Sequence, residues 1–498
     1  MTLALVALLL AGAGPAAGDQ AITAAAKKNF AELFELLSIP DVADRPADIQ
    51  RNAQFLRQAF EKRGFSARLL DDAAHRPLVF AELPARPSAK TLLFYLHFDG
   101  QPVIPEEWAQ KSPFEPVLKK RGSDGRWHEV DVNELQKTPL DPELRIFARA
   151  ASDDKGPIAT FLTGMDALAA SGARPAVNVK VLLDSEEEIS SPSLASVIAA
   201  DPGRFAADGL VILDGPVHAS GKPTVVFGNR GIAQLTLTVY GPPSPLHSGH
   251  FGNYAPNPPM RLAQLLAAMK DDDGRVLIPG YYDGVQLTAE DRAVLAHTGD
   301  DEAALKKRIG VSAAEKAFHS YQEALQYPSL NVRGLAAAAV GAKAANIVPS
   351  DAVAEIDLRT TPETDGRRLF GLIRSFVQQH GYHLVEGAPT EADRARYEKL
   401  ASLKLGAVQA AERMPIDSPL GRWAVTALSQ LGEEPVRIRM MGGTVPTDVL
   451  LAALKLPFVL VPTVNPDNNQ HAHDENLRVG NFIEGTRTMK ALLTTPWP

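Results

Sequence analysis

Between residues 91 and 215, short apolar runs alternate with stretches in which apolar residues recur at helical spacing. Residues 91–100 form a continuous apolar run that ends in glycine, and residues 176–184 and 208–215 have the apolar pattern of buried strands. Residues 153–172 carry apolar side chains three and four positions apart, which predicts a helix. Strands that alternate with helices predict an α/β fold with a mostly parallel sheet flanked by helices.

The hydrophobic pattern changes near Gly231. Residues 232–241 and 352–361 alternate apolar and polar positions, which is typical of an antiparallel sheet exposed on one face. Residues 285–330 are rich in Ala, Glu and Lys and are predicted to be a helical insertion. Because the first pattern resumes near residue 413, we expect a smaller α+β domain to be inserted into the larger one. The predicted domains are residues 25–230 and 411–498 for the larger domain and 231–410 for the inserted one.

Residues 1–18 read as a secretory signal peptide, because an apolar run is followed by small residues around Gly18. The basic residues that usually precede such a run are missing, since the first Lys or Arg is Lys27. An uncleaved anchor therefore remains an alternative. We expect export to the periplasm or the cell exterior, with no integral membrane span in the mature chain.

Composition narrows the classes of partner and of metal site. The hydrophobic content of 45% and charged content of 22% are ordinary for a soluble globular protein. The formal net charge of −8 leaves no basic patch for nucleic acid or for an anionic membrane surface. The chain has no cysteine, so any metal site must be built from histidines and carboxylates.

Polar side chains follow the predicted strands of the larger domain. They are His97, Asp99, Glu186, Glu187, Glu188, Asp214, His471 and His473. Asp153 and Asp154 fall just before a predicted helix, and one of this pair, which we take to be Asp154, is expected to be the helix N-cap. Ligands of open α/β sheets bind at the carboxyl ends of the strands. We therefore expect these side chains to gather at one edge of the sheet.

A cluster of carboxylates needs positive charge, because an unpaired buried carboxylate is strongly unfavourable. Lys155 alone supplies too little positive charge to balance these carboxylates, so one or two divalent metal ions are expected. Ligand sets of imidazole and carboxylate without sulfur suit zinc, manganese or cobalt. Two ions that share a carboxylate and a water would lower the pKa of that water from 15.7 to about 7. The predicted chemistry is hydrolysis of an unactivated bond.

Six motifs carry a family resemblance. They are HFD at 97–99, SDDKGP at 152–157, SEEEISS at 185–191, ILDG at 212–215, LHSGHFGN at 246–253 and QHAHDENLRVGNFIEG at 470–485. In this order they resemble the co-catalytic metallopeptidases that include carnosine dipeptidases, carboxypeptidase G, acetylornithine deacetylase and succinyl-diaminopimelate desuccinylase. The resemblance runs from about residue 25 to the C-terminus. The stretch YPSLNVRGL at 327–335 is most similar to the branch of carnosine and nonspecific dipeptidases.

The resemblance implies a catalytic domain with an inserted lid or dimerisation domain, and a role for each matching residue. The implied ligands of two divalent ions, zinc or manganese with cobalt as a further option, are His97, Asp153, Glu188, Asp214 and His471. Asp153 would bridge the ions, and Glu187 would be the general base. Asp99 would accept the other ring N–H of His97. His471 matches the ligand position of its motif, and His473 falls on a variable one.

In the inserted domain the resemblance implies that His247 hydrogen-bonds the developing oxyanion of an active site. That histidine comes from the other subunit in dimeric relatives, so a homodimer is expected. The implied substrate-binding residues are Asn346, Arg359, Gly442, Gly443 and Thr444, with Arg359 suited to a substrate carboxylate.

Three functions follow as hypotheses. The leading one is hydrolysis of the amide bond of dipeptides or short peptides that carry a free carboxylate. The same metal core would serve an N-acyl-amino-acid deacylase or aminoacylase, which remains the alternative. A non-catalytic binding protein on the same fold is disfavoured because all five implied ligands and Glu187 are present.

Overall fold

The computed structural model describes residues 17–70, 76–85 and 89–497. Residues 1–16 of the predicted leader lie outside the described residues. Contacts divide the chain into two compact units. The first unit runs to Thr224 and includes Arg422–Pro435 and the chain from Leu456 on; the second comprises Val225–Gly421 and Val436–Lys455. Among the described helices, none has both the length and the apolar character that a bilayer crossing requires.

The main sheet of the first unit is mostly parallel, as predicted. Within this unit its strand order is β1 (Ser66–Leu70), β2 (Leu78–Leu83), β7 (Asn178–Asp184), β3 (Thr91–His97), β8 (Gly209–Ile212) and β20 (Phe458–Leu460). The pairs β3–β7, β3–β8 and β8–β20 are parallel, whereas β1–β2 and β2–β7 are antiparallel. The strands β8 and β20 are buried along their whole length and β3 from its second residue on, because both faces of the sheet are covered there.

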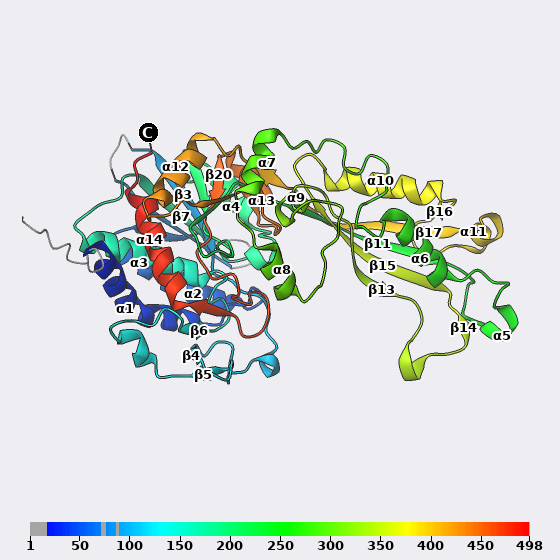
Figure 1. Cartoon of the computed structure of the whole chain (residues 1–498), viewed down its shortest axis with the longest axis horizontal. Helices are drawn as coiled ribbons and strands as arrows, with labels where there is room; N and C mark the ends of the chain where they lie inside the picture. The colour runs from blue at the N-terminus through cyan, green and yellow to red at the C-terminus, as the bar shows by residue number, and fades with distance from the viewer. Residues whose placement is uncertain (1–16, 71–75, 86–88, 498) are drawn as a thin grey trace, which may run out of the picture. The chain divides into compact units, whose positions relative to one another are not determined.

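Helices from both ends of the chain pack together beside this sheet. Figure 1 shows α14 (Val479–Thr494), in red, next to α1 (Ala17–Leu37), in dark blue, and both contact α3 (Lys155–Ala170). The ring of Phe161 in α3 lies 5.2 Å from that of Phe94 in β3, so the helix packs directly on the sheet. The remaining helices of this unit include α2 (Pro46–Glu61) and α4 (Leu194–Ala200), with 3₁₀ turns η1 (Pro105–Glu107), η2 (Val132–Gln136) and η3 (Glu187–Ile189).

A second sheet in the first unit was not predicted from the sequence. Its strand order is β21 (Asn476–Arg478), β6 (Arg145–Phe147), β4 (Val117–Arg121) and β5 (Trp127–Glu129). Leu118, Ile146 and Leu477 on one face join a buried apolar cluster with α1. We call this the accessory sheet. It anchors the C-terminal segment that follows His471.

The second unit is built on an antiparallel sheet with one covered face. Its strand order is β13 (Asn331–Ala336), β15 (Asp351–Thr360), β11 (Gly231–Tyr240), β17 (Leu400–Gln409) and β16 (His383–Leu384), the β16–β17 pair being parallel. Alternate residues of β11 and β15 are buried under α6 (Pro258–Met269) and α10 (Gly366–Gln379), which lie on one face of this sheet in Figure 1. This burial of every second residue accounts for the alternation of apolar and polar positions at 232–241 and 352–361.

The other elements of the second unit are short. They are β10 (Gly228–Asn229), β12 (Leu246–His247), α5 (Ser248–Phe251), α7 (Ala289–Ala296), α8 (Glu302–Ile309), α9 (Tyr321–Ala324), β14 (Ile347–Val348), α11 (Glu391–Arg396), β18 (Glu412–Arg413), β19 (Val436–Ile438) and α13 (Thr447–Leu454). Residues 436–455, which the sequence pattern assigns to the larger domain, group with the second unit by their contacts. Among these contacts, the Arg439 guanidinium donates to Asp291 at 2.6 Å and to Gln326 at 2.7 Å.

Candidate metal centre

Three neighbouring strands deliver polar side chains to one edge of the main sheet. His97 ends β3, and the register places it opposite Asp184, the last residue of β7. Asp214 follows β8, which lies on the other side of β3. Glu187 and Glu188 begin the turn η3 just after β7. The carboxyl ends of these strands therefore bring the polar side chains together at one edge of the sheet, as the sequence predicted.

The first potential metal-binding group consists of three buried residues, His97, Asp153 and Asp214. One ligand atom from each lies within 4.8 Å of the others. The Nε2 atom of His97 is 3.0 Å from Oδ1 of Asp153. Asp153 reaches the sheet edge because it sits in the turn that precedes α3.

The second group consists of Asp153, Glu188 and His471, again with ligand atoms within 4.8 Å of one another. The Nε2 atom of His471 is 2.9 Å from Oδ2 of Asp153 and 3.5 Å from Oε2 of Glu188. Asp153 belongs to both groups and directs one oxygen to each histidine. His473 lies instead 3.8 Å from the carboxylate of Glu107.

The buried charges of this site are of the kind that a bound cation would stabilise. Burial and, after it, the charge of Asp153 raise the pKa of Asp214 to about 6 and that of Glu188 to about 7. Burial opposes the charged form of Asp153 as well, but hydrogen bonds from His471 and His97 hold its pKa below the ordinary value. The hydrogen bond to Asp153 raises the pKa of His471 to about 9. Imidazole and carboxylate groups that share protons in this way suit divalent ions of the zinc and manganese type.

Asp99 fixes the turn that carries the two glutamates. Its carboxylate accepts hydrogen bonds from the backbone N–H groups of Glu187, at 3.1 Å, and Glu188, at 3.0 Å. The predicted contact to the ring of His97 is longer, because Nδ1 is 3.4 Å from the Asp99 carboxylate and 3.1 Å from its backbone oxygen. Asp99 therefore positions the turn as much as it orients the imidazole.

The four acidic residues of 184–188 divide into two kinds. Asp184 accepts hydrogen bonds from the Tyr95 hydroxyl at 2.8 Å and the Ser191 hydroxyl at 2.6 Å. Glu186 is buried, accepts from the backbone N–H of Ser193 at 3.0 Å and pairs with Arg76. Glu187 is of the second kind: its backbone is held by Asp99, and burial together with the charges of Asp214, Glu188 and Asp153 raises the pKa of its carboxyl well above the ordinary value.

Asp154 has a different role from the one predicted. It occupies the N-cap position of α3, but its side chain makes no capping hydrogen bond. Its carboxylate accepts instead from the backbone N–H of His97 at 3.2 Å. Lys155 is also directed away from the metal groups, because its ammonium is buried against Asp41 at 2.9 Å. The carboxylate cluster thus gains no neutralising charge from this lysine.

Glu475 is a site residue that sequence reasoning missed. It is fully buried, and its Oε1 accepts from Ser152 N–H, the Ser152 hydroxyl and Asp153 N–H at 2.9, 2.9 and 3.0 Å. Its Oε2 accepts from Ala150 N–H at 3.0 Å and from Arg149 at 2.7 Å. This single carboxylate holds the turn that presents Asp153. The sequence offered one signal, an acidic residue within the last motif, shortly before α14 begins at Val479.

The remaining predicted residues lie in the second unit. His247 is exposed, and its Nδ1 accepts from Gly249 N–H at 3.0 Å; its strand β12 pairs with β14, which follows the exposed Asn346. Arg359 donates to the Thr444 hydroxyl at 2.8 Å, and that hydroxyl donates to the backbone oxygen of Arg230 at 2.7 Å. Gly442 and Gly443 directly precede Thr444. Arg359 and Thr444, distant in sequence, are therefore adjacent in the fold.

Known proteins match this chain over most of its length. Residues 93–495 match Peptidase family M20/M25/M40. A Cys-Gly metallodipeptidase of Schizosaccharomyces pombe is 26% identical over 91% of this chain and 92% of its own, and a Beta-Ala-His dipeptidase of Homo sapiens is 27% identical over 83% and 76%. The solved structure of an M20 family metallo-carboxypeptidase from Sulfolobus solfataricus superimposes with a TM-score of 0.74 at 27% identity, covering 94% of this chain and 98% of that one.

These matches confirm the family resemblance and the α/β fold expected from the sequence. The matched residues 93–495 include every member of the two potential metal-binding groups. The chain belongs to the M20/M25/M40 family of peptidases and is a metallopeptidase.

Proposed function

We propose that this metallopeptidase hydrolyses the amide bond of dipeptides or short peptides that carry a free carboxylate. The observation that carries the proposal is the pair of ligand groups joined by Asp153, in a chain whose relatives include a Cys-Gly metallodipeptidase and a Beta-Ala-His dipeptidase. His97 and Asp214 would hold one divalent ion, and Glu188 and His471 the other. Bound ions would polarise the scissile carbonyl and make water a nucleophile at neutral pH.

Glu187 is the general base in this proposal. Its carboxylate takes a proton from the attacking water and returns it to the leaving amine. The raised pKa of Glu187, caused by burial and by the neighbouring carboxylates, is suited to a group that must both accept and release a proton. Asp99 holds the backbone of Glu187 and Glu188, so the base and the ligand keep a fixed spacing.

Residues of the second unit are proposed to bind the parts of the substrate other than the scissile amide bond. We propose that Arg359 binds the substrate carboxylate, oriented by Thr444, with Gly442, Gly443 and Asn346 lining the substrate. His247 is proposed to donate a hydrogen bond to the oxyanion in the active site of a second subunit, which requires a homodimer. Export through the residue 1–18 leader completes the proposal.

A substrate panel tests this function. Dipeptides and N-acetyl amino acids are assayed side by side after addition of manganese or zinc. We expect turnover of dipeptides; activity on the N-acetyl substrates alone would instead support the deacylase alternative.

The register of the acidic stretch is tested by a matched pair of variants. Glu187→Gln should retain its metal content and lose turnover by several orders of magnitude. Glu186→Gln is the control, because the Glu186 carboxylate is bonded to Ser193 N–H and Arg76 rather than free to move a proton. Loss of turnover in Glu186→Gln with full activity in Glu187→Gln would show that the assignment is wrong by one residue.

A further inference from the structure

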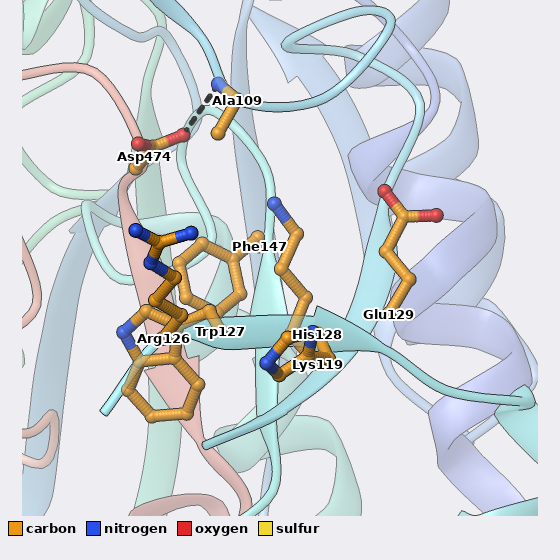
Figure 2. Close-up of a pocket in the computed structure, with 8 residues that line it drawn as sticks. All are labelled: Ala109, Lys119, Arg126, Trp127, His128, Glu129, Phe147 and Asp474. Atoms are coloured by element: carbon orange, nitrogen blue, oxygen red, sulfur yellow. Dashed lines mark hydrogen bonds between the residues drawn. The ribbon is translucent and has the colours of Figure 1, made fainter. Parts of the chain in front are cut away.

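The accessory sheet carries a cavity that the proposed catalytic mechanism does not use. One face of this sheet packs Leu118 and Ile146 into the core. The opposite face opens into a cavity of about 580 Å³, drawn in Figure 2. Cavities of this size are typical of small-molecule sites. We call it the accessory pocket.

Lys119 is the most buried charged residue that lines this pocket. The residue is only 4% exposed, and Figure 2 shows its ammonium directed into the pocket. Its Nζ lies 4.6 Å from the centre of the Phe147 ring, and among the described residues none accepts a hydrogen bond from it or forms an ion pair with it. Burial lowers the pKa of Lys119, while the charges of Asp474 and Glu129 raise it. The aliphatic stem of Lys119 is therefore buried, while its ammonium faces the open pocket without an acceptor among the described residues, so an anionic group of a ligand can bind there.

Charges of both signs line the pocket around an aromatic wall. Figure 2 shows Arg126 beside Asp474 on one side of Lys119 and Glu129 on the other. The rings of Trp127 and Phe147 lie 5.4 Å apart in an edge-to-face arrangement below them. A ligand that matches these groups has a carboxylate, an ammonium group and an apolar side chain.

We propose that the accessory pocket binds a free amino acid with an apolar side chain. Its carboxylate is received by Lys119 and Arg126. Its ammonium group faces Asp474, which lies beside Arg126, and its side chain packs on Trp127 and Phe147. The site is separate from the residues proposed to bind the peptide substrate.

The pocket also contacts the segment that carries a predicted metal ligand. Oδ1 of Asp474 accepts from the backbone N–H of Ala109 at 2.9 Å, which ties this segment to the rim of the pocket. Asp474 follows His471 by three positions and directly precedes Glu475. An amino acid bound at Asp474 would therefore hold the same segment that positions His471.

Calorimetric titration of the full chain with L-phenylalanine tests the proposal. Lys119→Met keeps the aliphatic stem against Phe147 and removes the charge. Lys120→Met is the matched control, since Lys120 is exposed and pairs with Asp141 at 2.8 Å. We expect equal Kd values for the unmodified chain and Lys120→Met, and a Kd at least tenfold higher for Lys119→Met. Phenylalaninamide, which lacks the carboxylate, should bind the unmodified chain at least tenfold more weakly than phenylalanine.

Two results would overturn the proposal. One is equal affinity of Lys119→Met and Lys120→Met for phenylalanine, which would place the amino acid at another site. The other is the lack of any binding of phenylalanine, leucine or methionine to the unmodified chain at millimolar concentration. If circular dichroism shows that Lys119→Met is unfolded, the variant Arg126→Gln is used in its place, because Arg126 is exposed. We expect its Kd for phenylalanine to be several-fold higher than that of the unmodified chain. These titrations do not depend on turnover, so failure of the proposed peptidase activity leaves them interpretable.

Discussion

Replacement of Glu475 by glutamine should loosen the turn that presents Asp153. The carboxylate of Glu475 accepts five hydrogen bonds, from Arg149, Ala150, Ser152 and Asp153. Glutamine keeps one acceptor oxygen and places an amide N–H where N–H donors already point. In either orientation it also removes the negative charge that pairs with the buried Arg149.

The expected magnitude follows from the burial of this pair. Breaking a buried ion pair by removing one partner costs about 3–5 kcal/mol. Each kcal/mol lowers the melting temperature of a large domain by about 2–4 °C, so we expect the Tm of Glu475→Gln to fall by roughly 6–20 °C. Residues that orient metal ligands typically change metal affinity by about 10–100-fold when they are replaced. We therefore expect metal binding by Asp153 to weaken within that range.

Differential scanning calorimetry and a chelator competition titration measure the two effects. Glu484→Gln is the matched control, because Glu484 is an exposed glutamate paired with Arg487 at 2.6 Å. An exposed pair contributes at most about 1 kcal/mol, so this variant should be close to the unmodified chain. The reasoning would be refuted if the two variants had the same Tm and the same metal affinity. That outcome would mean that Glu475 is already protonated, since glutamine resembles a neutral carboxylic acid.

Two further predictions concern the metal ions themselves. Asp153→Ala should lose both metal ions and His471→Ala only one, because Asp153 belongs to both potential metal-binding groups. Elemental analysis measures the metal-to-protein ratio, and equal ratios in the two variants would contradict this prediction. When a chelator has removed the metal ions, the free energy of unfolding should fall as the pH rises from about 4 to about 7. The reason is that Asp214 and Glu188 keep their protons in the folded chain up to pKa values of about 6 and 7, whereas the unfolded chain releases these protons near pH 4. Thermal unfolding at pH 5 and pH 7 measures this, and manganese should restore stability at pH 7.

The parallel sheet and its polar edge could be predicted because their signals are local. The apolar run of β3 ends at His97, and the run of β8 ends just before Asp214, so strand ends and candidate ligands were read together. The accessory sheet could not be predicted in this way. Its strands β5 and β6 have three residues each, and β21 pairs with β6 across more than three hundred positions of the chain. Such pairings leave no periodic pattern in a short window.

Tertiary contacts also explain the errors at single residues. Asp154 has the local sequence of an N-cap, but the backbone N–H of His97 offers its carboxylate a donor from another strand. Glu475 looks like one acid among several in a loop, and only the fold brings the donors of residues 149–153 to it. In both cases a carboxylate that could accept hydrogen bonds from its own segment accepts them from a segment that is distant in the sequence.

The roles proposed for the acidic residues of 184–188 agree with how firmly the scaffold holds each carboxylate, since among the described residues Glu188 accepts a single side-chain hydrogen bond, from Gln101 at 2.6 Å. Asp184 is held by Tyr95 and Ser191, and Glu186 by Ser193 and Arg76, so neither can turn toward a substrate without breaking buried hydrogen bonds. The backbone of the next two residues is fixed by the two oxygens of Asp99. Their side chains are the pair in this stretch with strongly raised pKa values, caused by burial among like charges. A base one position earlier would require Glu186 to leave its ion pair, which is why the Glu186→Gln and Glu187→Gln pair decides the register.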